Sequence, residues 1–176
     1  MINEYSMNQK SRWVYFYKIM LSTLIIYFIV FIGYIYYQKI EDFYIIIKFF
    51  SGILLSGWFL IFGLPLFLLY FNHRKYSIDV VLKQNGNTFL YKNNNKSITF
   101  SFDDIKKVEL WLTPPAYDNR IDWQFFGKYH FIAIHTNKNQ VINISCLVFD
   151  KAKKVFPEEL IERKKKFFPF LKRNKI

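Results

Sequence analysis

Two long stretches without a charged residue constrain this chain more than any other feature. The first runs from Ile19 to Tyr37 and the second from Phe49 to Phe71, which makes them 19 and 23 residues long. As helices, at about 1.5 Å per residue, they measure about 28 and 34 Å, and the hydrocarbon core of a bilayer is about 30 Å thick. We therefore predict two transmembrane helices, over residues 13–37 and 49–71.

Two alternatives to a membrane hairpin have weaker support in the sequence. A secretory signal peptide has a shorter apolar region than the first run, and QKIED follows where a small-residue cleavage site is expected. A buried helical hairpin of a soluble protein seldom has apolar stretches of this length without a charge. No ionisable residue lies inside either run, which argues against a transporter.

The distribution of charge predicts the orientation of the hairpin. Residues 38–48 form a short connection with no net charge, whereas Lys and Arg occur both before the first run and just after the second. By the positive-inside rule, both termini lie in the cytoplasm and the connection lies on the opposite side. Lys outnumbers Arg by 20 to 5, a bias typical of AT-rich bacterial genomes. We therefore predict a multi-pass protein of the bacterial cytoplasmic (inner) membrane.

Small residues in the second run indicate a helix-packing site. Gly52 and Ser56 are four residues apart, which is the small-xxx-small spacing that lets helices approach closely. Packing within the hairpin and formation of a homodimer are both compatible with this pair. Pro65 is expected to kink the helix near its cytoplasmic end.

Beyond the second run the hydrophobic period changes to two, which predicts a β-rich domain. Polar turns such as QNGN separate short alternating segments, at the spacing of an antiparallel barrel or sandwich. We predict six strands, over residues 76–83, 88–92, 96–102, 106–112, 129–136 and 140–147. Helical segments are expected over 150–156 and 157–168, the second with Pro157 at its first position and basic residues in its last turn.

Two segments resemble the bacterial pleckstrin-homology-like (PH-like) membrane proteins with an N-terminal two-span hairpin. They are KSITFSFDDIKKVELW, in which a strand runs into a turn, and YHFIAIHTNKNQVINISCLVFD, read as two strands entering a helix. The resemblance covers residues 76–168. It implies a small, partly open barrel with a C-terminal helix, used for binding or assembly and without shared catalytic residues. The long loop 113–128 and Pro157 depart from that pattern.

The predicted fold class is therefore an integral membrane protein, with two transmembrane α-helices followed by a small α+β cytoplasmic domain, a PH-like antiparallel barrel with a C-terminal helix. The expected parts are a cytoplasmic N-terminal segment, two spans with a short loop between them, the PH-like domain and a basic tail. Their boundaries are 1–12, 13–37, 38–48, 49–71, 72–168 and 169–176.

Residues that often carry chemistry lack a supporting arrangement. His130 and His135 lie on one predicted strand at an odd separation, so their side chains leave opposite faces and cannot share a metal ion. Cys146 is in phase with inward-facing residues, which predicts an inert buried thiol. Asp103 and Asp104 lie at a turn, where carboxylates commonly bind backbone amides. We expect no enzyme activity, no cofactor and no metal site.

Two surfaces are candidates for binding, and the first is the basic C-terminal stretch. Of the +12 net charge, +10 lies after Phe71. The stretch fits a solvated charge run, a nucleic-acid arm or a contact with anionic lipids, and its place near the membrane favours the lipids over nucleic acid. Its candidate membrane-binding residues are Arg163, Lys164, Lys165, Lys166, Phe167, Phe170, Lys172, Arg173 and Lys175.

The second candidate is the aromatic loop 113–128, because 16 residues without a regular pattern are uncommon in a small domain. It either binds a headgroup or peptide, or folds back over the barrel. Its candidate residues are Tyr117, Arg120, Trp123, Phe125, Phe126 and Lys128. The predicted function is non-enzymatic membrane-surface or protein binding, in scaffolding or regulation, with the lipid bilayer and a homodimer or membrane protein as partners. An accessory subunit of a transport or secretion complex, or a membrane-bound immunity protein, are the alternatives.

Overall fold

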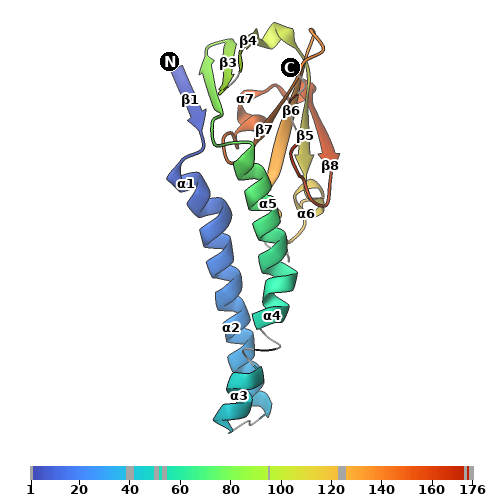
Figure 1. The fold of residues 1–176 in the computed structure, drawn as a ribbon. Helices are drawn as coiled ribbons and strands as arrows, with labels where there is room; N and C mark the ends of the chain where they lie inside the picture. Colours follow the sequence, from blue (N-terminus) through green and yellow to red (C-terminus); the bar gives the residue numbers. More distant parts are fainter. Residues whose placement is uncertain are drawn as a thin grey trace.

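Two helices project together from one side of a β-rich domain in the computed structural model (Figure 1). The structure describes residues 2–38, 42–49, 52, 55–94, 96–122, 126–172 and 174. The first helix is continuous and consists of α1 (Gln9–Arg12), the π-helical η1 (Trp13–Tyr17) and α2 (Lys18–Gln38). After α3 (Phe43–Phe49), the second helix consists of α4 (Leu55–Trp58), the π-helical η3 (Phe59–Gly63) and α5 (Leu64–Lys75).

Both helices are long and apolar enough to cross a membrane, judged by length and composition alone. A Cβ on Gly57 would lie 3.3 Å from the hydroxyl of Tyr27 in the first helix, whereas a Cβ on Gly52 would meet nothing within 4 Å. Ser56 is exposed and its hydroxyl donates to the carbonyl of Gly52. The role of the Gly52–Ser56 pair, in packing within the hairpin or in a homodimer, therefore remains a prediction.

Pro65 lies inside α5, immediately after the π-helical segment η3. Proline cannot donate its backbone nitrogen to the preceding turn, and a π-helical turn is one way in which a helix accommodates that loss. The predicted kink at Pro65 itself remains a prediction.

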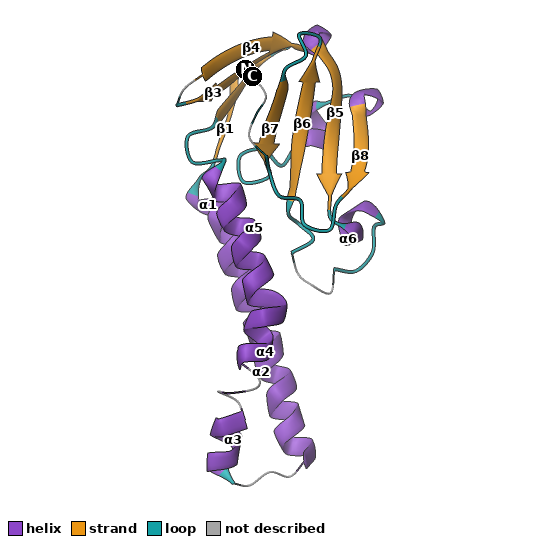
Figure 2. Ribbon diagram, turned by 45° about the vertical axis from the view of Figure 1, so that its right-hand side comes forward, coloured by secondary structure: helices purple, strands orange, loops and turns teal. Residues whose placement is uncertain are grey.

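The domain consists of two four-stranded sheets that enclose the larger core (Figure 2). The first has the order β1-β2-β3-β4 and the second β7-β6-β5-β8. The strands are β1 (Ile2–Ser6), β2 (Val81–Asn85), β3 (Thr88–Asn93), β4 (Lys96–Ser101), β5 (Ile105–Leu112), β6 (His130–Thr136), β7 (Val141–Ser145) and β8 (Ile161–Lys165). The six predicted strands are present as β2 to β7, with shifted ends. The two sheets bury alternate apolar residues, among them Leu82, Phe89, Val108 and Ile134.

Strand β2 begins five residues later than predicted, because α5 continues past the apolar run. Residues 76–79 form a turn after the helix, in which the hydroxyl of Ser77 donates to the carbonyl of His73 at 2.6 Å. Ser77 is fully buried. The alternation of apolar residues in this segment therefore spans a helix end as well as a strand.

Strand β1 was not predicted, and it changes the relation between the domain and the hairpin. It pairs antiparallel with β2, from Ile2↔Asn85 to Ser6↔Val81. The ring of Tyr5 packs on Phe149 at a centroid distance of 4.9 Å. The expectation that the domain simply follows the hairpin is therefore wrong. Both helices are inserted between two neighbouring strands of one sheet.

The predicted helix over 157–168 is also wrong. A single 3-10 turn, η5 (Glu158–Leu160), leads into β8, which pairs parallel to β5. Pro157 has extended backbone angles, and the free edge of β5 offers hydrogen bonds along a whole strand. The short helix α7 (Ala152–Val155), within the segment predicted at 150–156, is followed by Phe156, which enters the core beside Phe89.

Candidate functional site

The end of the domain nearest the hairpin contains most of the predicted binding residues. This hairpin-side end consists of α6 (Pro114–Tyr117), the loop that follows it, the end of β8 and residues 166–172. Figure 2 shows α6 at one end of β5, on the same side of the domain as the projecting helices. Two sequence-distant candidates, the loop 113–128 and the basic stretch, are thus brought together here.

The first basic residues are ordered in β8 and hold α6 in place. Arg163 donates to the carbonyls of Ala116 and Tyr117, at 3.2 and 2.7 Å, and lies over the Tyr117 ring. Lys165 pairs with Asp118 at 2.8 Å. Hydrogen bonds from Lys165 and then Arg120 lower the pKa of the Asp118 carboxyl. Residues i and i+2 of a strand lie on the same face, which explains why Arg163 and Lys165 both reach α6 and its following residue.

Other basic residues of the stretch are partly committed as well. Lys164 pairs with Glu162 at 3.1 Å. The ammonium of Lys166 donates to the carbonyl of Phe170 at 3.2 Å and lies over the rings of Trp111 and Phe131. Burial lowers the pKa of Lys166. The basic stretch is therefore a folded part of the domain, and not a free arm.

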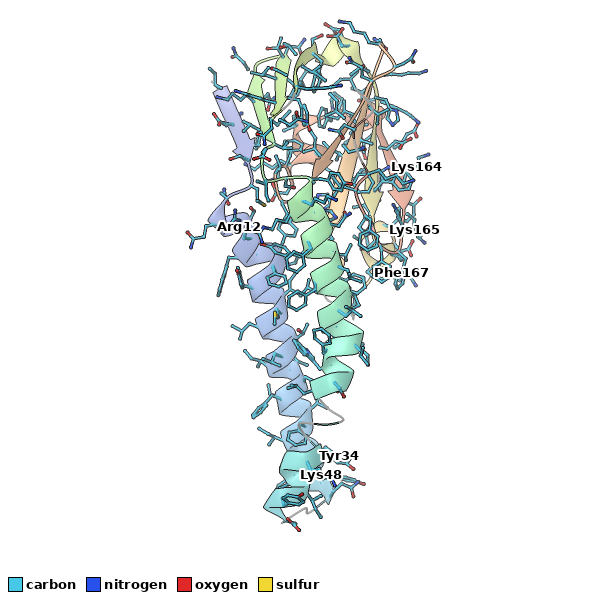
Figure 3. The ribbon with its side chains drawn as sticks, viewed as in Figure 1. Arg12, Tyr34, Lys48, Lys164, Lys165 and Phe167 are labelled. Atoms are coloured by element: carbon cyan, nitrogen blue, oxygen red, sulfur yellow. The ribbon has the colours of Figure 1, made fainter. Side chains whose placement is uncertain are left out.

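The remaining candidate residues of the basic stretch differ in exposure. Phe167 is 51% exposed, Phe170 is half-buried and Lys172 is exposed. Arg173 and Lys175 lie outside the described residues. In Figure 3, Lys165 lies at about the level of Arg12, and Phe167 lies further toward the far end of the helices. The exposed ring of Phe167 thus lies on the side of the domain from which the helices project.

The aromatic loop folds back on the domain at its described residues. Phe126 is buried and stacks on Phe168 at a centroid distance of 5.5 Å. The hydroxyl of Thr113 donates to the carbonyl of Gly127 at 2.9 Å, which closes the loop at its base. Arg120 and Lys128 are exposed. Trp123 and Phe125 lie outside the described residues, so their binding role remains a prediction.

A buried polar joint, which the sequence did not indicate, fixes the hairpin to the domain. The hydroxyl of Tyr129 donates to the carbonyl of Tyr15 in η1 at 2.6 Å. The ring of His73 contacts the hydroxyl of Ser145 at 2.9 Å and the carbonyl of Pro169 at 3.0 Å. Polar groups cost free energy when buried without partners, so these contacts define one arrangement of helix and domain. A lone His after an apolar run gives no sequence signal for such a role.

The residues considered for chemistry have structural contacts. Cys146 is buried, and its pKa is raised to about 12, chiefly by burial. Asp104 accepts hydrogen bonds from the amide and hydroxyl of Ser101, at 2.8 and 2.9 Å, as expected of a turn carboxylate. His130 contacts the carbonyl of Lys128 at 2.8 Å. Within the described ranges, no three His, Cys, Asp or Glu residues gather as a metal site would require.

Comparison with known proteins agrees with this architecture. A family model described as PH domain matches residues 4–154. The match begins inside β1 and extends into α7, so it contains the inserted hairpin. No curated protein and no solved structure matches the chain. Because the matched residues make up most of its length, the chain belongs to the PH domain family.

Proposed function

We propose that this protein is a membrane-anchored, non-enzymatic PH domain of the bacterial inner membrane, and that its hairpin-side end rests on the anionic cytoplasmic leaflet. PH domains in general bind membrane surfaces or proteins. The observation that carries the proposal is the insertion of an apolar hairpin between β1 and β2, with the exposed ring of Phe167 on the side of the domain from which the hairpin projects.

The exposed surface of the hairpin supports a lipid environment. Ile29 and Val30 are each 63% exposed, Leu60 is 62% exposed, and many of their neighbours are about half exposed. Apolar surface in water costs roughly 25 cal/mol per Å², and soluble monomers rarely expose continuous apolar patches above a few hundred Å². A bilayer removes that cost along the exposed apolar faces of both helices.

The fixed joint supports contact between the domain and the leaflet. If the helices cross the bilayer, Arg12 lies at the cytoplasmic boundary, and Lys165 lies at the same level. Cations near an anionic leaflet contribute about 1 kcal/mol each, within a Debye length of about 8 Å. Pairing of Lys164 and Lys165 with Glu162 and Asp118 weakens this attraction. We therefore expect a modest salt dependence.

The proposal is tested with the full-length chain in nanodiscs of neutral or anionic lipid. A polarity-sensitive fluorophore is attached to Phe167→Cys or, as the control, to Lys83→Cys in β2. We expect the emission of the Phe167→Cys label to shift to the blue in anionic nanodiscs and to return as salt is raised. The Lys83→Cys label should respond to neither change.

Orientation is tested separately in cells. A membrane-impermeant maleimide should label Tyr36→Cys, which replaces a residue 87% exposed at the far end of the first helix, in intact spheroplasts. Lys83→Cys should react only after the membrane is opened. The reverse labelling pattern, or extraction of the protein by alkaline carbonate, would contradict the membrane assignment.

A further inference from the structure

Strand β4 is an edge of the first sheet, and its outer side has no partner strand in the described part of the chain. Figures 1 and 2 show it at the end of the domain opposite the projecting helices. The leaflet contact proposed above uses the hairpin-side end. A contact made by the outer edge of β4 is therefore independent of it.

The register of the first sheet shows which backbone groups of β4 point outward. The amide of Phe102 donates to the carbonyl of Asn87 at 3.1 Å, and the β3–β4 pairing continues without a shift from that bond. In an antiparallel ladder only every second residue exchanges hydrogen bonds with a given neighbour. The backbone N–H and C=O groups of Ser97, Thr99 and Ser101 therefore face away from β3.

Two of these three residues have unpaired backbone groups. The amide of Ser101 donates to the carboxylate of Asp104 at 2.8 Å. For the amides and carbonyls of Ser97 and Thr99, no partner occurs within the described ranges. Both residues are exposed, so these groups are accessible. An extended chain laid along the edge can pair with two N–H and two C=O groups.

β4 also lacks the features that protect sheet edges. Charged side chains and covering segments commonly keep an edge from pairing with another chain. β1 carries Glu4, and residues 162–165 of β8 are all charged. The edge of β7 is covered by Asn174, whose side chain accepts from the amide of Asn143 at 2.8 Å. Residues 97–101 of β4 carry no charge, so this is the least protected of the described edges.

A groove along this edge contains a buried hydroxyl without a partner. The groove has a volume of about 270 Å³, and its walls are β4 and the turn between β6 and β7. Thr136 lines it and is only 3% exposed, and its hydroxyl has no hydrogen-bond partner among the residues that the structure describes. A buried polar group without a partner costs about 1–3 kcal/mol, and a bound polar atom removes that cost. This hydroxyl is a second feature that indicates a ligand with hydrogen-bonding atoms.

The groove fits one extended chain better than the edge of another sheet. The β6–β7 turn lies across the groove from β4. Paired strands lie about 4.8 Å apart, so a strand that already belongs to a sheet would bring its next neighbour into that turn. In an antiparallel single chain, the residue opposite Ile98 lies on the same face as Ile98, which lines the groove with Thr136.

We propose that β4 binds an extended peptide segment of a partner protein by strand addition. The backbone of the segment pairs with Ser97 and Thr99. A short side chain that forms hydrogen bonds, Ser, Thr or Asn, faces the hydroxyl of Thr136.

The proposal is tested with random linear peptides displayed on phage. They are selected on the full-length protein in neutral nanodiscs after depletion on empty nanodiscs, and the dissociation constants of the synthetic peptides are measured by fluorescence polarisation. We expect Ser, Thr or Asn at one fixed position. N-methylation of single peptide amides should weaken binding about tenfold at alternate positions only, because every second amide donates to β4. This scan uses the unaltered protein.

Three variants locate the binding at this edge. Thr99→Pro removes an outward N–H without breaking a bond to β3, so the fold is retained and binding should weaken about tenfold. Thr99→Val keeps that amide and is the matched control, with unchanged binding. Thr136→Val removes the unpaired hydroxyl and should weaken binding about fivefold, whereas the melting temperature of the free protein stays the same or rises.

Several results would overturn the proposal. They are the absence of any enriched peptide, equal weakening at consecutive N-methylated amides, equal affinity of Thr99→Pro and Thr99→Val, and unchanged affinity in Thr136→Val. A second copy of this chain is the alternative occupant. Sedimentation velocity in detergent would then show a dimer that Thr99→Pro dissociates and Thr99→Val does not, and that result would also contradict the proposal.

Discussion

At the scale of single residues, Cys146 is a possible reactive thiol, because it lies beside His73 in the buried polar joint. Its sulfur lies 3.7 Å from Nδ1 of His73, a distance that invites comparison with a Cys–His nucleophile. Nδ1 also contacts the hydroxyl of Ser145, and Nε2 contacts the carbonyl of Pro169. A carbonyl can only accept, so Nε2 donates its hydrogen there, and in the neutral ring Nδ1 is then the acceptor.

We predict that the thiol of Cys146 is inert in the folded protein. Burial raises its pKa to about 12, so at pH 7 the thiolate fraction falls about a thousandfold or more below that of an ordinary cysteine. Alkylation by a small maleimide, followed by mass spectrometry, should be negligible in detergent and rapid in denaturant. Modification of the native protein at the rate of a free peptide thiol would contradict this prediction.

At the scale of elements, the two-residue alternation of apolar side chains predicted the strands whose partners are near in sequence. β2, β3 and β4 are joined by short turns, as are β6 and β7, so alternation and turn residues were sufficient. β1 is five residues long and its partner begins at Val81, beyond both helices. In β8 the apolar residue Ile161 is followed by four charged residues, which favoured a helix when read alone. Its strand conformation depends on the edge of β5, which local sequence does not report.

The two segments predicted to bind meet at the hairpin-side end, and their binding role remains a prediction. The sequence could not show that Arg163 and Lys165 are held by α6, because those contacts span more than 45 residues.

We predict that β8 positions α6 through Arg163. In Arg163→Ala, two carbonyls of α6 lose a charged donor and Tyr117 loses its stacked guanidinium. Amide hydrogen exchange at residues 116–120 should accelerate, with a fall in melting temperature of about 2–4 °C, or about 1 kcal/mol. Lys164→Ala, which loses only an exposed ion pair, is the matched control and should change little. Equal exchange in both variants would show that α6 is held by other contacts.

At the scale of the whole molecule, β1 makes the hairpin and the domain one body. The chain enters the first helix from β1 and leaves the second toward β2, and those two strands pair along five residues. Tyr129 and His73 then tie both helices to the second sheet. A movement of one helix is therefore coupled to the sheets. Residues 74–176 alone lack one strand of this body.

Removing residues 1–6 tests this coupling in the full membrane protein. Without β1, β2 becomes an edge strand, and the packing of Tyr5 on Phe149 and the ion pair of Glu4 with Lys83 are lost. We expect lower melting temperature, faster hydrogen exchange at Val81–Asn85, and a broader distance distribution between spin labels on Tyr36→Cys and Lys107→Cys. Because Cys146 is expected to be inert, it need not be removed for labelling.

A point substitution within β1 separates the loss of the strand from the loss of its side chains. Ile2→Ser alters a residue 66% exposed and should leave exchange in β2 unchanged, whereas Tyr5→Ala removes the aromatic contact and keeps the backbone pairing. We expect Tyr5→Ala to lower the melting temperature with little change in label distances. If truncation leaves both β2 exchange and the distance distribution as in the complete chain, the first helix is held by the polar joint alone, and β1 has no role in fixing the hairpin.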